Sequence, residues 1–335
     1  MVSEDRAPTE RWRPSALPAV LERRAELYRR IRDFFAERGV LEVDTPILSA
    51  AATTDPNIES FVTRYVGPGA PQGRARYLQT SPEFPMKRLL AAGSGPIYQL
   101  CKVFRQGEAG RYHQPEFTML EWYRPGLDHH GLMNEVEALL IELTSGHLSL
   151  APSVRLSYAE AFQSYLGLDP HRADTSDLRA CAEESGLGPV SGLAADDRDG
   201  WLELLQAGAL ESRLPRDRPV FIFDFPASQA ALARVRPGAP DVAERFELYL
   251  DGLELANGFH ELADAAEQRR RFASDVARRA AGGGETMPMD ERLLAALEHG
   301  LPDCAGVALG VDRLLMRIVG ASTIGEVTAF AWESA

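Results

Sequence analysis

The chain has 335 residues, of which 45% are hydrophobic and 25% charged, and its formal net charge is −13. These values are typical of a soluble globular protein with one large domain or two ordinary ones. They argue against a membrane-spanning protein, since no stretch approaches the roughly 18 apolar residues that a span requires, and mildly against a large nucleic-acid surface.

The first predicted element is an amphipathic helix over residues 17–38, where apolar side chains recur at steps of three and four. Ser15 is the expected N-cap of this helix and Gly39 its expected end. A short strand over residues 40–43 follows, and it ends before Pro46.

The next part of the chain predicts the centre of a sheet. Residues 77–80 read as a strand and residues 82–92 as a helix that begins with proline. Residues 97–106 and 115–124 predict an antiparallel pair of strands, and residues 129–144 an amphipathic helix.

From about residue 150 to 215, short helical segments alternate with loops, which predicts an inserted helical subdomain without obvious chemistry. Strands and helices mix without the regularity of β-α-β units. The predicted fold class is therefore α+β, an antiparallel sheet flanked by helices. The remaining predicted elements are a strand over 220–225, a hairpin over 246–256, helices over 261–281 and 290–299, a strand over 306–311 and a helix from 313 to 319.

The strand over 115–124 carries charged residues among aromatic ones. Its two-residue period places Phe117, Met119, Glu121 and Tyr123 on one face. A flat aromatic ring, a carboxylate and a phenol could recognise a planar ring and a cation. Taken alone, however, the pattern favours an ordinary half-buried sheet in which Glu121 pairs with an arginine.

The hairpin over 246–256 is predicted from Asp251-Gly252, a strong two-residue turn signal. This turn places Tyr249 opposite Glu254 and makes Glu247 a diagonal neighbour of Glu254, roughly 7–8 Å away. Two carboxylates at that distance repel each other unless a cation lies between them, and Mg²⁺ with substrate phosphates is the usual solution. A solvent-facing acidic hairpin is the alternative.

The stretch GVALGVDRLL, residues 306–315, predicts a strand of small residues that leads into a helix. Small side chains let a ligand approach the backbone, and Arg313 could reach a phosphate. Together with Arg105 on an earlier strand, these features predict a nucleoside triphosphate site. Neither a P-loop nor a GxGxxG pattern is present.

These stretches resemble the three motifs of class II aminoacyl-tRNA synthetases: the helix through VLEVDTPILS, then FRQGEAGRYHQPEFTMLEW, then GVALGVDR. HQPEFTMLEWY and ELANGFHEL are similar to lysyl-tRNA synthetases in particular. The resemblance covers residues 17–332. It implies a single catalytic domain over residues 17–335 after an N-terminal extension over 1–16.

Three departures separate the chain from lysyl-tRNA synthetases. No anticodon-binding OB domain precedes the first motif, Ala308 stands where those enzymes have glycine, and FPASQAAL at 225–232 differs. In these respects the chain resembles the elongation factor P–(R)-β-lysine ligases, truncated paralogues that modify a protein lysine. That resemblance implies activation of (R)-β-lysine as an adenylate and its transfer to a lysine ε-amine of elongation factor P.

The resemblance also implies roles for individual residues. Arg105 and Arg313 would be catalytic, on the α- and γ-phosphates of ATP, and Phe117 would stack on adenine. Glu247 and Glu254 would hold Mg²⁺. Residues implied in ATP binding are Arg105, Gln106, Gly107, Glu108, His113, Gln114, Phe117, Glu254, Leu255, Gly310 and Arg313. Residues implied in substrate binding are Ser81, Pro82, Glu83, Glu121, Tyr123, Asn257, Phe259, Glu261 and Ala308.

One position departs from the second motif. That motif usually has glutamate two residues after its arginine, where this chain has Gly107, and Glu108 is the candidate replacement. The first motif builds a dimer interface in this class, which implies a homodimer through helix 17–38. Packing of that helix within its own core is the alternative.

Two other functions remain open at this stage. One is a minimal lysyl-tRNA synthetase that activates α-lysine, although tRNA binding is not the expectation. The other is a non-catalytic, synthetase-like regulatory subunit. No membrane partner is expected. Cytoplasmic location is expected because the charged N-terminus is no signal peptide and the cysteines are few and far apart.

Overall fold

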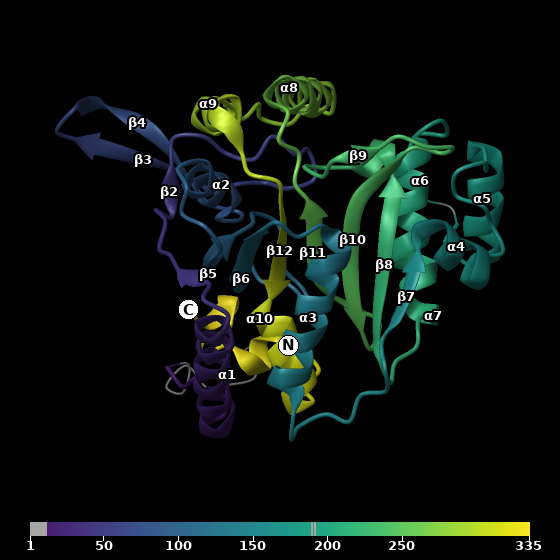
Figure 1. The fold of residues 1–335 in the computed structure, drawn as a ribbon, viewed down its shortest axis with the longest axis horizontal. Helices are drawn as coiled ribbons and strands as arrows, with labels where there is room; N and C mark the ends of the chain where they lie inside the picture. Colours follow the sequence, from purple (N-terminus) through teal and green to yellow (C-terminus); the bar gives the residue numbers. More distant parts are fainter. Residues whose placement is uncertain (1–11, 189, 191) are drawn as a thin grey trace.

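The computed structural model describes residues 12–188, 190 and 192–335. Of the predicted extension over residues 1–16, only residues 12–16 fall within the described part. The core is a nine-stranded sheet (Figure 1). Along the sheet the strands run in the order β1 (Leu41–Glu42), β5 (Ile97–Phe104), β6 (Glu116–Pro125), β12 (Cys304–Gly310), β11 (Leu253–His260), β10 (Val242–Leu250), β8 (Pro219–Pro226) and β7 (Val154–Ser157), and β9 (Val235–Arg236) pairs with β10.

The predicted α+β class is confirmed, with one correction to the sheet. All pairs from β5 to β8 are antiparallel, as predicted. At the two edges, however, β1 runs parallel to β5 and β7 runs parallel to β8. The sheet is therefore mixed, because each edge strand is joined to its neighbour by a long crossover, through β2–β4 and α2 for β1 and through α4–α7 for β7, rather than by a hairpin.

One face of the sheet is covered by α1 (Pro18–Glu37), α3 (His129–Thr144) and α10 (Val311–Val319). The apolar stripe of α1 enters the main core at Leu27, Ile31 and Phe35. Its N-terminal residue Leu17 is instead 71% exposed. The alternative of packing within the chain's own core thus holds for the second half of this helix.

Ser15 is not the N-cap of α1, contrary to the prediction. The N-cap is Leu17, without a side-chain hydrogen bond, and Pro18 opens the helix, where its missing N–H costs nothing. The Ser15 amide donates instead to Ala329 O at 2.8 Å. The segment before α1 is therefore tied to the C-terminal segment.

The segment 150–215 forms the helices α4 (Tyr158–Leu166), α5 (Thr175–Glu184), α6 (Arg198–Leu205) and α7 (Glu211–Arg213), the short helical segments that were predicted for it. A π-helical segment over Gln206–Leu210 joins α6 to α7. Leu202, Phe162 and Tyr158 share one apolar cluster with Phe225 of β8. Helix α4 therefore packs directly on the sheet at β7 and β8, and α5 packs on α6, at the right of Figure 1.

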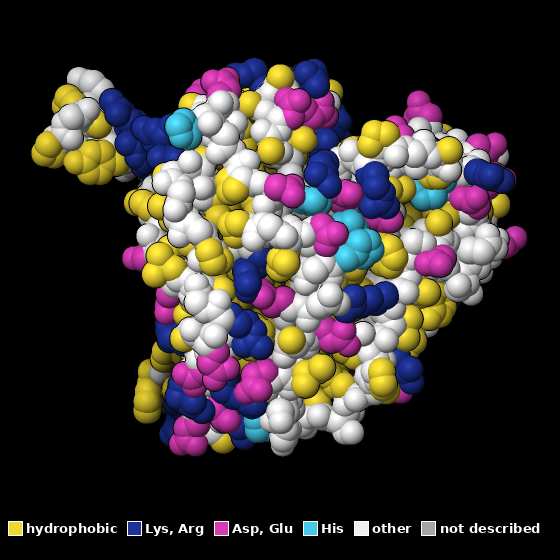
Figure 2. All heavy atoms as spheres, viewed as in Figure 1, with side chains coloured by type: hydrophobic (Ala, Val, Ile, Leu, Met, Phe, Trp, Pro, Cys, Tyr) yellow, Lys and Arg dark blue, Asp and Glu magenta, His cyan; other side chains and the backbone are white. Residues whose placement is uncertain are grey.

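A three-stranded sheet of β2 (Leu48–Ser49), β3 (Val62–Gly67) and β4 (Ala70–Leu78) was not predicted beyond the end of β4. Its β3–β4 hairpin projects from the body, with basic side chains near its base and apolar ones at its tip (Figures 1 and 2). Most side chains of β3 are exposed. A strand without a buried face lacks the alternation that would predict it.

The hairpin between β10 and β11 forms as predicted. Asp251 and Gly252 both have positive φ, 54° and 69°, as a type I′ turn requires, and Tyr249 pairs with Glu254. A β-bulge then shifts the register, because Leu248 pairs with Ala256 rather than Leu255. The bulge reverses the alternation of β11 and turns its next odd-numbered residues to the face opposite the main core.

The end of the sheet that lies away from α1 and α10 is covered by α2 (Glu83–Ala91), α8 (Ala265–Ala281) and α9 (Glu291–Gly300) (Figure 1). Met86, Leu90, Phe272 and Leu293 form their common apolar cluster. Across the described part of the chain, no helix is both long and apolar enough to span a membrane.

Gly258 of β11 tests the close packing of the central strands. A Cβ at this position would lie 2.5 Å from the Phe246 ring and 3.0 Å from Gly306 O. We expect Gly258→Ala to lower the free energy of unfolding by about 1–3 kcal/mol through overpacking. Gly110→Ala, whose Cβ meets nothing within 4 Å, is the control in chemical denaturation. Equal stability of the two variants would contradict the packing described.

Candidate active site

A cavity of about 660 Å³ opens over the face of the sheet opposite the main core. Its floor comes from three adjacent strands in register. Glu121 of β6 pairs with Ala308 of β12, which pairs with Asn257 of β11. In the next row, Tyr123 pairs with Gly306, which pairs with Phe259. Eight of the predicted substrate residues line the cavity together: Ser81, Glu83, Glu121, Tyr123, Asn257, Phe259, Ala308 and Glu261, the last just after the end of β11.

Glu121 lies at the centre of this floor and is 2% exposed. The Ser81 hydroxyl donates to one of its carboxylate oxygens at 2.7 Å, and the Tyr123 hydroxyl donates to the other at 2.7 Å. Burial, followed by repulsion from Glu83, raises the pKa of Glu121 to about 8. The predicted arginine partner is wrong: the described hydrogen bonds to this carboxylate come from hydroxyl groups.

Lys87 of α2 was missed by the sequence analysis, yet it lies within the same acidic group. Its side chain is 2% exposed, and Nζ is 2.6 Å from Glu83 and 2.5 Å from Glu261. Burial alone lowers the pKa of Lys87, but attraction to these two carboxylates outweighs it and raises the pKa. The spacing of Glu83 and Lys87 at i and i+4 on a helix was the available signal.

The floor carries more acid than base. Burial raises the pKa of Glu261 to about 7, although Lys87 attracts its charge. The side chains of Tyr123 and Glu261 both lie over Gly306, where a Cβ would approach them within 2.5 Å. Three carboxyl groups thus face one ammonium group, and the arrangement is suited to a ligand that brings further positive charge.

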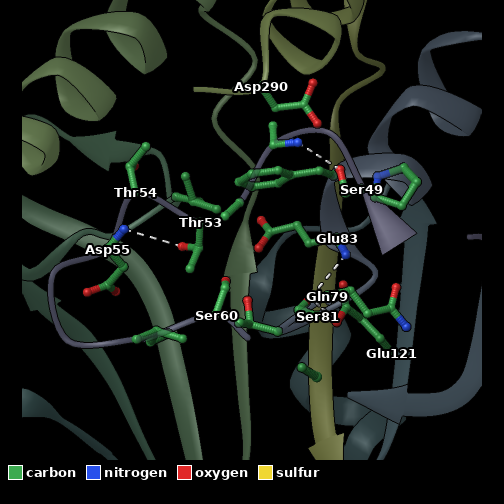
Figure 3. Close-up of a pocket in the computed structure, with 18 of the residues that line it drawn as sticks. Ser49, Thr53, Thr54, Asp55, Ser60, Gln79, Ser81, Glu83, Glu121 and Asp290 are labelled. Carbon is green, nitrogen blue, oxygen red and sulfur yellow. Dashed lines mark hydrogen bonds between the residues drawn. The ribbon is translucent and has the colours of Figure 1, made fainter. Parts of the chain in front are cut away.

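The roof of the cavity was not predicted. It comes from the segment between β1 and β3, whose Ser49, Thr53, Thr54 and Asp55 line the cavity and lie around Glu83 (Figure 3). Ser49 ends the first motif, VLEVDTPILS, but neither that motif nor the residues after it were predicted to line the cavity. Pro82, a predicted substrate residue, is buried at the N-cap of α2 and does not line the cavity.

Arg105 lines the same cavity at the end of β5. Its guanidinium carbon lies 5.2 Å from the centre of the Phe117 ring, and Nη1 is 3.7 Å from Glu108. Gly107 has φ +82°, a conformation that favours glycine. The structure therefore explains why glycine occupies the position of the usual glutamate, and it brings Glu108 to the arginine.

Arg313, the second predicted phosphate-binding arginine, lies in α10 and does not line the cavity. Nη1 donates to Glu254 O at 2.8 Å, and Nη2 lies 2.6 Å from His113 Nε2. Burial and then the Arg313 charge lower the pKa of His113, whose surroundings also include Glu108 and Arg105. The residues implied in ATP binding from both motifs therefore lie within electrostatic range of one another.

The remaining residues implied in ATP binding have these places. The Gln106 amide donates to Glu59 O at 2.8 Å, and Gln114 is 8% exposed. Gly310 ends β12 at the start of α10. Leu255 is 2% exposed within the main core, so a ligand could meet only its backbone.

Glu247 and Glu254 lie close enough to repel each other, although the bulge pairs Glu247 with Asn257 and departs from the regular hairpin that was predicted. Burial and then repulsion from Glu247 raise the pKa of Glu254. Glu211 of α7 joins them: burial and the charges of Glu254 and Glu247 raise its pKa to about 8. Three carboxyl groups that repel one another fit the oxygen ligands that Mg²⁺ prefers. Glu211 was missed, because the segment 150–215 showed no chemical pattern.

Glu247 is also held by neutral and cationic donors. Gln206 donates to it at 2.7 Å, Tyr249 donates to the same oxygen, and Arg245 Nη2 donates to the other at 2.5 Å. Arg245 Nε lies 3.3 Å from Asn257 Oδ1. Arg245, also missed from sequence, thus connects the acidic hairpin to the floor of the cavity.

Comparison with known proteins agrees with this geometry. Residues 8–334 match the family model described as tRNA synthetases class II (D, K and N). Curated relatives named elongation factor P–(R)-β-lysine ligase include that of Edwardsiella ictaluri, 54% identical over 97% of this chain and 98% of the relative. Those of Klebsiella pneumoniae and Vibrio cholerae are 53% identical (98% and 99% covered) and 52% identical (97% and 98%). The chain belongs to the elongation factor P–(R)-β-lysine ligase family, within the class II tRNA synthetases.

Proposed function

We propose that this protein is an ATP-dependent ligase that activates (R)-β-lysine and joins it to a lysine ε-amine of elongation factor P. The relatives' name supplies the acceptor and the amino acid. The single observation that carries the choice of ligand is the acidic floor of Glu83, Glu121 and Glu261 around one buried lysine, Lys87. A lysine isomer brings two ammonium groups to this floor.

Charge balance favours such a ligand over an uncharged amino acid. When ionised, the three carboxyl groups carry two more negative charges than the single positive charge of Lys87 balances. Burial raises the pKa of Glu121 and of Glu261, which shows that their ionised forms lack sufficient positive charge beside them. Each ammonium group restores that balance and gains charge-assisted hydrogen bonds. An apolar side chain would leave the buried carboxyl groups without partners.

The proposed reaction has two steps. A substrate carboxylate oxygen attacks the α-phosphorus of ATP, the bond to the β-phosphate oxygen breaks, and pyrophosphate leaves. The acceptor amine then attacks the carbonyl carbon of the adenylate, loses a proton and displaces AMP. Arg105, which reaches the cavity from β5, is suited to neutralise charge on the α-phosphate.

The other end of the triphosphate is assigned to Arg313, whose guanidinium lies beside His113. Phe117 would stack on adenine, since its ring lies beside Arg105. Glu247 and Glu254, with Glu211 beside them, would hold Mg²⁺, which supplies charge neutralisation for the phosphates when bound. No serine or cysteine nucleophile is required, because alignment and electrostatic stabilisation are sufficient.

We also propose a homodimer, with the first half of α1 at its interface. Leu17, immediately before α1, and Leu41 and Leu48, on the short strands after it, are 71%, 57% and 51% exposed. Leu41 and Leu48 belong to the first motif, which builds a dimer interface in class II synthetases, and a partner subunit would cover them. Elongation factor P belongs to translation, so the proposed location is the cytoplasm, in keeping with three free cysteines.

The direct test is mass spectrometry of elongation factor P after incubation with this protein, ATP and either (R)-β-lysine or α-lysine. We expect the mass of one β-lysyl group on one lysine, and less product with α-lysine. A parallel assay offers tRNA with α-lysine. Aminoacylated tRNA without labelled elongation factor P would instead identify a minimal lysyl-tRNA synthetase, and absence of any ATP–pyrophosphate exchange would identify a non-catalytic protein.

Ala308 allows a second test, of selectivity between the two lysine isomers, because it lies between Glu121 and Asn257 on the cavity floor. Ala308→Gly removes one methyl group where the two lysine isomers would place their amino groups differently. We expect the ratio of kcat/KM for α-lysine to that for β-lysine to rise about 10-fold in ATP–pyrophosphate exchange. Ala305→Gly, the same change on the core face of β12, should lower stability and leave the ratio unchanged. An unchanged ratio in Ala308→Gly would contradict the role.

A further inference from the structure

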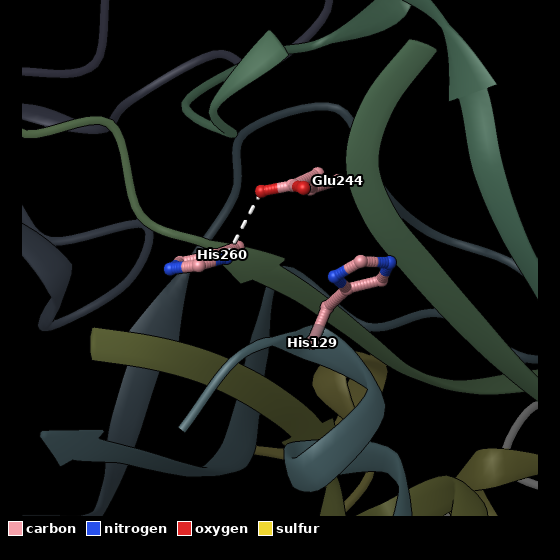
Figure 4. Close-up of side chains that lie close together, drawn as sticks. All are labelled: His129, Glu244 and His260. Atoms are coloured by element: carbon pink, nitrogen blue, oxygen red, sulfur yellow. Dashed lines mark ion pairs between the residues drawn. The ribbon is translucent and has the colours of Figure 1, made fainter. Parts of the chain in front are cut away.

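A second group of chemically active side chains lies on the other face of β11, behind the cavity floor. His260 immediately precedes Glu261 in the chain and points to the opposite face, towards His129 of α3 and Glu244 of β10 (Figure 4). All three side chains are buried, and one potential ligand atom from each lies within 4.8 Å of the others. Nothing in the proposed ligase reaction uses this group.

Both histidines are oriented from outside by a carboxylate. His260 Nε2 is 2.8 Å from Asp303 Oδ1, and His129 Nε2 is 3.3 Å from Asp224 Oδ1. A histidine that donates its outer N–H to a carboxylate presents the lone pair of its other nitrogen inward, which is the usual arrangement behind a metal-bound histidine.

The two inward nitrogens differ in their surroundings. His129 is 1% exposed, and its Nδ1 has no hydrogen-bond partner among the residues that the structure describes. His260 Nδ1 lies 2.9 Å from Glu244 Oε2. With the outer nitrogen of His260 as donor, these two atoms both carry lone pairs, and they need a cation beside them.

In the structure that cation is the guanidinium of Arg234. Its Nε donates to Glu244 Oε2 at 2.7 Å, and its Nη2 lies 3.1 Å from His260 Nδ1. Arg234 is 46% exposed at its side chain, so it can withdraw into solvent. Glu244 keeps a second arginine, Arg236, at 3.2 Å on its other oxygen.

The local backbone explains why the carboxylates face this group. The pairing of β10 with β8 shifts register between Ala243 and Phe246, so two residues of β10 oppose one residue of β8. The opposed residue, Asp224, has φ +57°. This bulge directs Glu244 to the face opposite Arg245, which lines the cavity.

We propose that His129, Glu244 and His260 form a binding site for one divalent transition-metal ion of the Zn²⁺ type. Two imidazole nitrogens and one carboxylate oxygen are a common three-residue zinc ligand set, which leaves a fourth position for water. Tetrahedral zinc holds its ligand atoms roughly 3.3 Å apart, so binding draws His129 inward and displaces Arg234.

A metal ion at this site would connect three elements of the fold behind the cavity. The metal would join the start of α3 to β10 and to the end of β11, next to Glu261. The side chains of Arg234 and Asp303, which contact the group, are 46% and 72% exposed, so the group lies close to solvent.

The test is Zn²⁺ binding to the full-length protein after chelator treatment, followed by calorimetry and thermal unfolding. We expect one equivalent of Zn²⁺ and a rise in Tm. His129→Ala should weaken binding by at least the roughly 10–100-fold that loss of a supporting carboxylate costs, and it should abolish the rise in Tm. His130→Ala, which removes the exposed neighbour, is the matched control and should bind like the wild type.

Arg234→Gln keeps all three ligands and removes the competing cation. We expect tighter Zn²⁺ binding in this variant, and loss of that gain when His129→Ala is added. If the wild type and Arg234→Gln bind no Zn²⁺, the group is held by protons and arginine alone, and the proposal is overturned. Equal binding by the wild type, His129→Ala and His130→Ala would assign the zinc to surface groups and would likewise overturn the proposal.

Discussion

The gathering of three carboxyl groups around a single buried lysine is the constraint on which the rest of the site depends. Glu121 and Glu261 are buried, Glu83 is half-buried beside them, and Lys87 supplies a single positive charge, in contact with Glu83 and Glu261. Such an arrangement is costly in an isolated domain. In the proposed function a cationic ligand completes the charge balance, so the same feature would provide both affinity and selectivity.

Two features of the backbone place the side chains around the cavity. Gly306 lets Tyr123 and Glu261 cross above the central strand, and the bulge after Tyr249 turns Asn257 and Phe259 towards the cavity. The same alternation sends His260 to the opposite face, where the second polar group lies. Substrate recognition and the proposed metal site are therefore two faces of one strand.

Much of this could be predicted from sequence where a local pattern carries the information. The hairpin turn at Asp251-Gly252 set the pairing of Tyr249 with Glu254, and the two-residue period of β6 placed Glu121 and Tyr123 on one face. The resemblance to a family supplied the candidate roles. Lys87, Glu211 and the roof over residues 49–55 were missed because their positions follow from long-range packing. The bulge in β11 was missed because no residue type marks it.

The central claim is tested most directly by proton release on ligand binding. In the free protein the pKa values of Glu121 and Glu261 are raised to about 8 and about 7, so at pH 7 both groups are partly protonated. An ammonium ligand favours their ionised forms and lowers both values. Calorimetry of (R)-β-lysine binding in two buffers should show net proton release at pH 7 and affinity that rises from pH 6 to 8. Proton uptake, or affinity independent of pH, would contradict the account.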